Sequence, residues 1–230
     1  MEQKTLNRNQ LKYLAALAML VDHIAWAFVP TVSVLGELMH IIGRFTAPAM
    51  LFFLVEGYVH TGSIKRYAGR IALFALLSWV PCSLFEKGVW PYPYFGMLWT
   101  TLLALAALRV WDQSRISRAG KLAVIFGLCA LSLLGDWSVY GVLLPLVFLE
   151  YRDREKEKWR VYLVACVCFA GTALLISGPG QVFQFGALLA PLLLKRYNGE
   201  RGSAAAFHKW FFYVFYPAHL LLLWWLTIVI

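Results

Sequence analysis

Long apolar runs recur along almost the whole chain. Of its 230 residues, 61% are hydrophobic and only 14% are charged, and the mean hydropathy is +0.66. A soluble domain of this length does not need so much apolar surface, whereas helices that cross a bilayer do. The sequence therefore predicts an all-α fold, a polytopic integral membrane helical bundle in which residues 1–230 form a single transmembrane domain.

The apolar runs are separated clearly enough to be counted. A spanning helix needs about 20 apolar residues. The candidate segments are 11–29, 39–58, 67–85, 95–110, 121–135, 139–151, 161–176, 182–194 and 210–230. Three of them, 121–135, 139–151 and 182–194, are short for a bilayer core, which is typical of tilted, re-entrant or merged elements. We expect about nine transmembrane helices.

The basic residues indicate how these segments are oriented. The chain carries 21 Lys and Arg residues and a net charge of +9, and all of these residues except Arg44 and Lys87 cluster at every second boundary. The clusters are Lys4, Arg8 and Lys12; Lys65, Arg66 and Arg70; Arg109, Arg115, Arg118 and Lys121; Arg152, Arg154, Lys156, Lys158 and Arg160; and Lys195, Arg196, Arg201 and Lys209. Because positively charged loops stay in the cytoplasm, we expect a multi-pass protein of the inner (cytoplasmic) membrane with a cytoplasmic N-terminus. The basic rim fits anionic lipid or a nucleotide cofactor, and we expect no nucleic-acid partner.

An aspartate and a histidine, Asp22 and His23, lie near the middle of the first apolar segment. Ionisable residues at this depth are costly, which makes function the first hypothesis for them. Lys12 and His23 are eleven positions apart, so a helix places them on one face, about 16 Å apart along its axis. They either mark the entrance and the end of a cavity, or they are a snorkelling lysine and a histidine bonded to a neighbouring helix.

The second apolar segment carries two further buried charges. Arg44 and Glu56 are about 18 Å apart on one helix, too far to pair with each other. We expect Arg44 to pair with Asp22, and Glu56 to reach Lys12 or Arg70. Such pairs either build a site or only make the charges tolerable in the membrane.

The last apolar segment contributes a histidine, His219, at nearly the depth of His23. Pro217 lies two residues earlier and frees a backbone carbonyl. Two histidines at matching depth indicate a shared cavity. The alternative is a histidine that only satisfies the interrupted backbone.

The remaining chemical motifs are few. The four cysteines show no metal-ligand or redox spacing, and we expect them to be buried packing residues: Cys82, Cys129, Cys166 and Cys168. The sequence has no glycine-rich phosphate loop, no Ser-His-Asp order and no zinc signature. We therefore expect no metal cofactor.

Several motifs together resemble one family over nearly the whole chain. They are LVDHIAW in the first segment, IGRFTAPAMLFFLVEGYVHTGSIKRYAGRIALFALLSWVP across the second and third, YGVLLPLVF in the sixth, and QFGALLAPLLLKRYNGERG followed by WFFYVFYPAHLLLL at the end. These motifs resemble the TraX family, which is named for a conjugation protein that acetylates the N-terminus of pilin. Lys12, ten intervening residues and His23 also resemble the basic-x10-His signature of acyltransferase family 3, whose members move acyl groups from cytoplasmic acyl-CoA to acceptors across the membrane.

The resemblance implies an acyltransferase, an O- or N-acetyltransferase with acetyl-CoA as the acyl donor. The cations placed to hold the phosphates of the donor are Lys12, Lys65, Arg66 and Arg70. His23 then meets the acyl group inside the membrane, either as the base that deprotonates the acceptor or as the nucleophile that carries the acetyl group. Arg44 or His219 stabilises the oxyanion, and Asp22 and Glu56 complete the candidate catalytic set.

The acceptor and two other functions stay open at this point. The acceptor is an amine or a hydroxyl, on a pilin-like peptide or an envelope glycan, and membrane lipid is the other expected partner. A small-molecule transporter would use the same buried charges as a permeation path, and a non-catalytic membrane assembly protein would use them for packing. Binding of acetyl-CoA distinguishes the enzyme from both.

Overall fold

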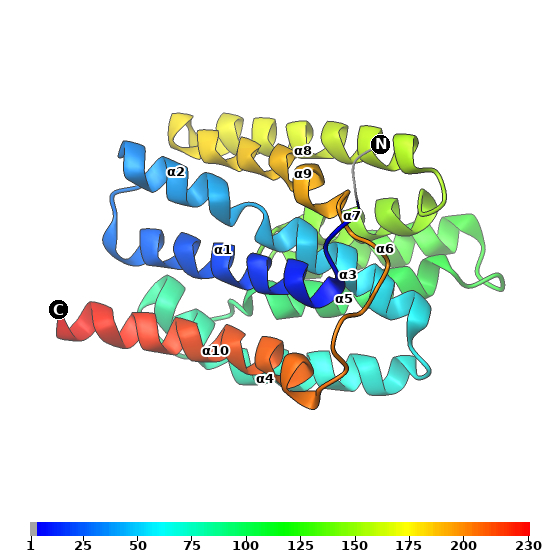
Figure 1. The fold of residues 1–230 in the computed structure, drawn as a ribbon, viewed down its shortest axis with the longest axis horizontal. Coiled ribbons are helices and arrows are strands. Elements are labelled where there is room, and N and C mark those ends of the chain that lie inside the picture. The colour runs from blue at the N-terminus through cyan, green and yellow to red at the C-terminus, as the bar shows by residue number, and fades with distance from the viewer. Residues whose placement is uncertain (1–3) are drawn as a thin grey trace. The chain divides into compact units, whose positions relative to one another are not determined.

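The computed structural model describes residues 4–230, which are helical along almost their whole length (Figure 1). The elements are α1 (Arg8–Phe28), α2 (Val34–Gly43), α3 (Thr46–His60), α4 (Ile64–Lys87), α5 (Gly96–Trp111), α6 (Arg118–Ser132), α7 (Ser138–Glu150), α8 (Glu155–Ser177), the 3-10 helix η1 (Pro179–Leu189), α9 (Ala190–Leu194) and α10 (Ala206–Val229). An isolated parallel β-bridge joins Leu6 to Tyr197. The predicted all-α fold is confirmed.

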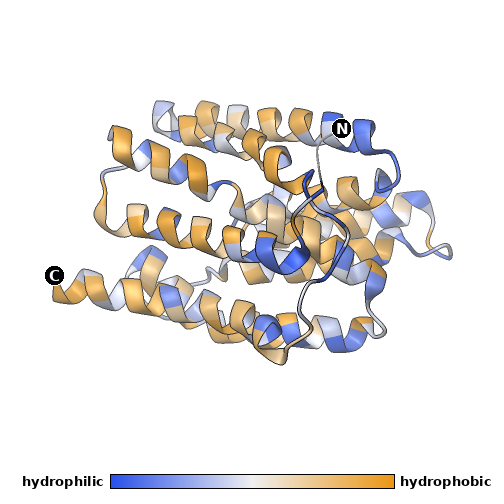
Figure 2. Ribbon diagram, in the orientation of Figure 1, coloured by the Kyte–Doolittle hydropathy of each residue, from blue (hydrophilic) through white to orange (hydrophobic). Residues whose placement is uncertain are grey.

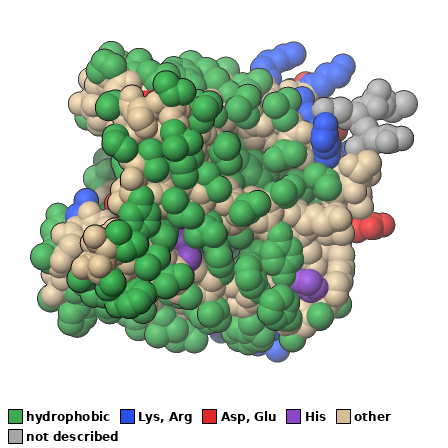
Figure 3. All heavy atoms as spheres, turned by 60° about the vertical axis from the view of Figure 1, so that its left-hand side comes forward, with side chains coloured by type: hydrophobic (Ala, Val, Ile, Leu, Met, Phe, Trp, Pro, Cys, Tyr) green, Lys and Arg blue, Asp and Glu red, His purple; other side chains and the backbone are tan. Residues whose placement is uncertain are grey.

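Each of the nine predicted apolar segments lies on these helices. Hydrophobic residues run along the helices, and hydrophilic residues gather at helix ends and in loops (Figure 2). By length and composition, five stretches of the described chain are able to cross a membrane: Arg8–Phe28, Val34–His60, Ile64–Lys87, Glu155–Ser177 and Ala206–Val229. Three shorter helices are also apolar: Gly96–Trp111, Ser138–Glu150 and Pro179–Leu194. The protein is a multi-pass helical membrane protein, and the face drawn in Figure 3 is covered mainly by hydrophobic side chains, with histidines visible between them.

The second predicted segment is one apolar stretch but two helices. α2 ends at Gly43 and α3 begins at Thr46, with a turn at Arg44 and Phe45 between them. Pro48 explains the interruption, because it has no N–H to donate to the carbonyl of Arg44 one turn earlier. The break leaves Arg44 at a helix end.

The eighth predicted segment is mostly 3-10 helix instead of α-helix. Pro191 has no N–H for the carbonyl of Ala187, which accepts instead from the backbone N–H of Ala190 and from the Tyr162 hydroxyl of α8, the latter at 2.7 Å. Gly186 lets η1 approach α2 closely, because a Cβ there would lie 2.6 Å from the carbonyl oxygen of Ile41. η1 is therefore fixed against both α8 and α2.

The chain divides into two compact units. The first unit contains Met1–Met50 and Trp159–Ile230. Within it, α1 lies between α2 and α10 (Figure 1). The backbone before α1 is bonded to the loop before α10, through Leu6 N–H to the carbonyl of Arg196 at 3.0 Å and Arg8 N–H to the carbonyl of Glu200 at 2.9 Å. α1 is thus placed between two other elements that carry polar residues of the candidate site.

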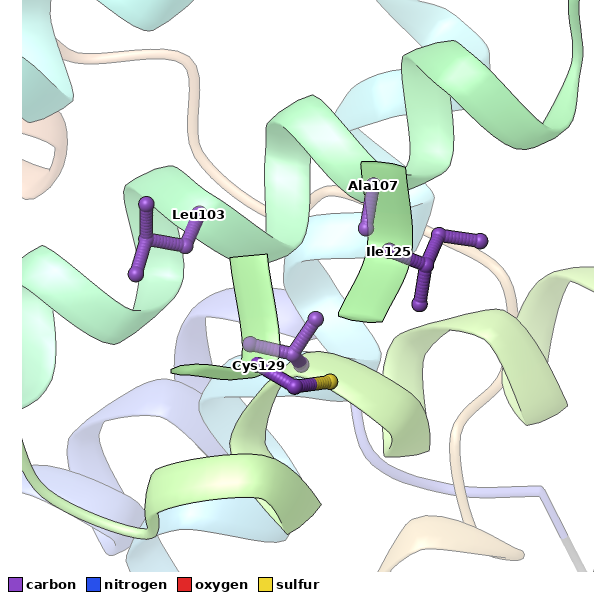
Figure 4. Packing of buried hydrophobic residues seen from close by; sticks show 5 residues of the cluster. Leu103, Ala107, Ile125 and Cys129 are labelled. Carbon is purple, nitrogen blue, oxygen red and sulfur yellow. The ribbon is translucent and has the colours of Figure 1, made fainter. Parts of the chain in front are cut away.

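The second unit contains Leu51–Lys158. Here α5 packs against α4, α6 and α7. A buried apolar cluster joins α5, α6 and α7 and consists of Leu103, Ala107, Ile125, Cys129 and Val142 (Figure 4).

The cysteines follow the expectation of buried packing residues in three cases out of the four. Cys82, Cys129 and Cys166 are buried, whereas Cys168 is exposed. The prediction was wrong for Cys168 because it lies two positions from Cys166 on α8, which turns it to the other side of that helix.

Candidate functional site

The carboxylate of Asp22 is held by two side chains from α2 and its end. Nη2 of Arg44 lies 2.5 Å from one carboxylate oxygen, and Nδ1 of His40 lies 2.8 Å from the other. All three side chains lie in the first unit, and the predicted pairing of Arg44 with Asp22 is confirmed. A buried carboxylate is tolerable in the membrane because each of its oxygens receives a charged or polar partner.

His40 was missed in the sequence. Its side chain is 0% exposed, and its ring lies 4.3 Å from that of Trp26 and 4.8 Å from that of Phe183, centroid to centroid. Among the described residues, nothing hydrogen-bonds to its Nε2. The signal that could have identified it is its spacing, because His40 lies four positions before Arg44 and therefore faces the same side of a helix.

Arg44 has a second anchor beyond Asp22. Its Nη1 donates to Oε1 of Gln184 on η1 at 3.2 Å, and its guanidinium carbon lies 5.2 Å from the ring centre of Phe183. Gln184 in turn donates to Gln181 at 3.0 Å. Arg44 therefore joins α1, α2 and η1 at one buried position.

Gly43 makes room for the carboxylate. A Cβ at this position would lie 2.6 Å from Oδ1 of Asp22 and closer still to the Cβ and Cγ of Asp22. Only glycine fits there while Asp22 keeps its partners.

His23 and His219 meet between α1 and α10. Nε2 of His219 lies 3.2 Å from Nδ1 of His23, and the ring centroids are 4.9 Å apart. The matching depth of the two histidines, expected from the sequence, is confirmed by this contact. His219 is buried, and His23 is half-buried.

Backbone carbonyls assign the protons of both rings. Nδ1 of His23 lies 2.8 Å from the carbonyl of Met19, and Nδ1 of His219 lies 2.7 Å from the carbonyl of Phe215. Because a carbonyl only accepts, each Nδ1 carries the proton in the neutral ring. His23 then shares its Nδ1 proton with Nε2 of His219, and the lone pair of His23 is at Nε2.

Lys12 faces the same helix as His23. Its ammonium lies 4.2 Å from the ring centre of Phe212 on α10, and the next residue, Tyr13, is hydrogen-bonded to Nδ1 of His208 at 2.8 Å. The predicted common face of Lys12 and His23 is therefore the face that packs on α10.

The other candidate residues lie in the second unit. Glu56 forms its ion pair with His60, at 4.0 Å, and not with Arg70. That expectation was wrong because the guanidinium of Arg70 lies over the ring of Tyr67, 5.7 Å from its centre. Lys12, the other expected partner of Glu56, belongs to the first unit and contacts Phe212.

The three candidate phosphate-binding cations of the second unit, Lys65, Arg66 and Arg70, lie in the first two turns of α4. Ser63 caps this helix by accepting from the backbone N–H of Arg66 at 3.4 Å. Lys65 and Arg66 are exposed, and Arg70 is half-buried. A helix N-terminus with basic side chains favours bound phosphate.

Within residues 4–230, no group of three or more His, Cys, Asp or Glu side chains is placed to hold a metal ion. The site that the structure brings together consists of the buried ion pair of Asp22 and Arg44, the ring of His40 on the same carboxylate, and the contacting rings of His23 and His219.

Comparison with known proteins gives a consistent result. The family model described as TraX protein matches residues 7–227. A protein of Dichelobacter nodosus named "Probable fimbrial assembly protein FimC, serogroup H1" is 33% identical over 234 residues, which covers 93% of this chain and 93% of that protein. No solved structure matches the chain. The resemblance indicated by the sequence motifs is confirmed, and the chain belongs to the TraX family.

Proposed function

We propose that this protein is a membrane-embedded acyltransferase, which moves an acetyl group from cytoplasmic acetyl-CoA to an amine or hydroxyl acceptor. The observation that carries the proposal is the pair of hydrogen-bonded histidines, His23 and His219, within two long apolar helices. Membership of the TraX family supports it, because the family is named for pilin acetylation. A purely structural pair would not need two titratable rings at a depth where either one is costly.

We propose that the whole chain forms one transmembrane domain of about nine spans, with the N-terminus in the cytoplasm. Within the first unit, the backbone of Leu6 bonds that of Arg196, and the ammonium of Lys195 lies 5.9 Å from the ring centre of Trp159. The basic clusters that begin at Lys4 and at Lys195 are therefore brought to one end of that unit, next to Trp159. This arrangement supports the alternation on which the topology rests.

The second unit supports the same alternation. Lys121 donates to the carbonyl of Trp111 at 2.6 Å, and Trp111 donates to Glu150 at 3.2 Å. The end of α5, the start of α6 and the end of α7 therefore meet. These are the helix ends that the positive-inside rule assigns to the cytoplasm.

In the first step, the Nε2 lone pair of His23 attacks the thioester carbonyl of acetyl-CoA. The carbon–sulfur bond breaks, CoA leaves as the thiolate, and the acetyl group stays on Nε2 as an acetyl-imidazolium. His219 is placed to take the Nδ1 proton through its Nε2, which leaves a neutral acetyl-imidazole. The position of His219 beside Nδ1 of His23 therefore fits a nucleophilic role for His23 better than a purely structural one.

The donor phosphates are assigned to the basic residues near the cytoplasmic helix ends: Lys12, Lys65, Arg66 and Arg70. The capped N-terminus of α4 adds its own partial positive charge to the last three. Arg66 is the residue to test, because it is exposed and its backbone N–H already defines the cap.

The two remaining candidates receive supporting roles. We assign Arg44 to the positioning of Asp22, because its terminal nitrogens contact Asp22 and Gln184. We assign Glu56 to ordering the end of α3 through His60. The sequence led us to expect Arg44 or His219 to stabilise the oxyanion. We no longer assign that role to Arg44.

The acceptor is proposed to be part of a pilus or of the cell envelope. The relative from Dichelobacter nodosus is named as a fimbrial assembly protein, which favours a pilin-like peptide over an envelope glycan. A non-catalytic role in assembly would fit the same name and is the alternative that the experiment must exclude.

The test uses the purified full chain in nanodiscs and measures acetyl-CoA binding and CoA release. The variants are His23→Ala and Arg66→Ala, with His208→Ala and Arg115→Ala as matched controls outside the site. We expect His23→Ala to bind acetyl-CoA without releasing CoA, and Arg66→Ala to bind it more weakly. Wild-type protein that is folded and does not bind acetyl-CoA would contradict the proposal and favour transport or assembly.

A further inference from the structure

His40 is held like a general base, with a carboxylate on one ring nitrogen and nothing on the other. Its Nδ1 contacts Asp22 at 2.8 Å, and no described residue bonds its Nε2, although the whole side chain is buried. We infer that His40 is a second catalytic residue, the base that deprotonates the acceptor. This inference rests on the proposed acyl transfer and names a residue that the sequence motifs did not include.

The partner of Nδ1 decides which histidine is the better base. When an imidazole takes up a proton at Nε2, a carboxylate on Nδ1 stabilises the new charge more than a neutral carbonyl does. His40 has the carboxylate of Asp22, whereas Nδ1 of His23 has the carbonyl of Met19 and the ring of His219. The two rings therefore suit different tasks, His40 the proton and His23 the acetyl group.

The carboxylate is itself prevented from turning away. Arg44 holds its other oxygen at 2.5 Å and is anchored to Gln184, and Gly43 has no side chain to displace the carboxylate. A buried Nε2 that lacks a hydrogen-bond partner destabilises the folded protein. This cost is reasonable at a site where the nitrogen receives an N–H or O–H from a substrate.

The side chains that pack on the ring of His40 indicate from which side an acceptor reaches it. Trp26 and Phe183 contact its ring, but Trp26 is 44% exposed and Phe183 is 0% exposed. On α1, Trp26 is about 40° around the helix from Asp22 and about 60° from His23, between the two. An acceptor that displaces the indole ring therefore reaches His40 on the stripe that adjoins His23. Because apolar side chains surround this stripe, the acceptor class is an amine or hydroxyl on an apolar, membrane-resident molecule.

The second step then balances as follows. The acceptor nitrogen or oxygen attacks the carbonyl carbon of acetyl-His23, and Nε2 of His40 takes the acceptor proton. The bond between the acetyl carbon and Nε2 of His23 breaks, and His219 returns the Nδ1 proton to His23. His40 releases its proton to water, and the CoA thiolate from the first step takes one up.

Two isosteric variants separate this role from a structural one. Asparagine at position 40 places an amide near Nδ1, so His40→Asn keeps a donor for Asp22 and lacks Nε2. Glutamine reaches the position of Nε2 with an amide that is not basic. His208→Asn is the matched control, because His208 lies near the start of α10, contacts Tyr13 and is outside the proposed machinery.

The experiment measures both half-reactions of the full chain in nanodiscs. The first is exchange of labelled CoA into acetyl-CoA, which needs His23 and no acceptor. The second is acetyl transfer to octylamine, a membrane-soluble amine, and to water. We expect His40→Asn and His40→Gln to keep exchange within a few-fold and to lose about 100-fold or more of the transfer to both acceptors.

The outcomes are distinct for the two proposals. Transfer retained in His40→Asn, or exchange and transfer lost together, would overturn the role of His40 and leave it as a support for Asp22. Wild-type exchange without transfer to octylamine or water would also overturn it, because an open base serves small acceptors. Wild-type protein without exchange would overturn the proposed function itself, and the second half-reaction with it.

Discussion

Gly43→Ala tests whether the buried carboxylate of Asp22 is as tightly enclosed as the structure shows. The added methyl carbon would lie 2.6 Å from Oδ1 of Asp22 and closer still to its Cβ and Cγ. Asp22 has little freedom to give way, because Arg44 and His40 hold both of its oxygens. Either the helices separate or the carboxylate leaves its partners.

The expected cost follows from those two routes. In a helix interior, alanine is more favourable than glycine by about 0.8–1.0 kcal/mol, and this gain is common to any helical glycine. Overpacking costs about 1–3 kcal/mol, and a buried charge left without its partner costs about 3–5 kcal/mol. Relative to a helical Gly→Ala control, Gly43→Ala should therefore lose at least about 1–3 kcal/mol of unfolding free energy.

Gly171 on α8 supplies the control, because a Cβ there meets nothing within 4 Å. The assay is equilibrium unfolding in mixed micelles with a rising fraction of SDS, followed by circular dichroism. Gly171→Ala should match or exceed the wild type, and Gly43→Ala should unfold earlier. Equal stability of the two variants would refute the enclosed carboxylate.

Three other predictions use the same unfolding measurement. Gly186→Ala places a methyl carbon 2.6 Å from the carbonyl oxygen of Ile41, and because backbone cannot rotate away we expect a loss of about 1–3 kcal/mol; stability equal to the wild type would contradict the close contact. Tyr162→Phe removes the hydroxyl that donates to the carbonyl of Ala187, while the backbone N–H of Ala190 still donates to that carbonyl, so we expect a loss of about 0.5–1.5 kcal/mol; an unchanged midpoint would argue against the bond. Burial raises the pKa of Tyr94 well above its ordinary value of 10.0, so above that pH the unfolded chain loses a proton that the folded chain keeps. Stability should then fall by up to about 1.4 kcal/mol per pH unit, and Tyr94→Phe should reduce this slope between about pH 9 and 11; an unchanged slope would refute it.

The sequence was sufficient for the helices and for two contacts of the site. Hydropathy located every apolar segment, because a membrane helix must be apolar over its whole length. The cost of unpaired charge in the membrane led from Asp22 to Arg44, and helical depth led from His23 to His219. These contacts follow from rules that act along single helices.

The parts that were missed depend on how helices meet. Its spacing from Arg44 places His40 on the face of Arg44, but only the contact with Asp22 on another helix shows that it belongs to the site. The 3-10 geometry of η1 follows from Pro191 together with the Tyr162 hydroxyl, which lies far away in the sequence. Glu56 pairs with His60 on its own helix and not with Arg70, because the guanidinium of Arg70 lies over the ring of Tyr67.

The most direct test of the central claim is CoA exchange by His23→Ala, His219→Ala and the double variant, in the same nanodisc preparation. If the two rings act as one unit, each single variant should lose nearly all exchange, and the double variant should be no worse than His23→Ala. Exchange that survives in His23→Ala, or losses that multiply in the double variant, would show that the pair does not carry the acetyl group.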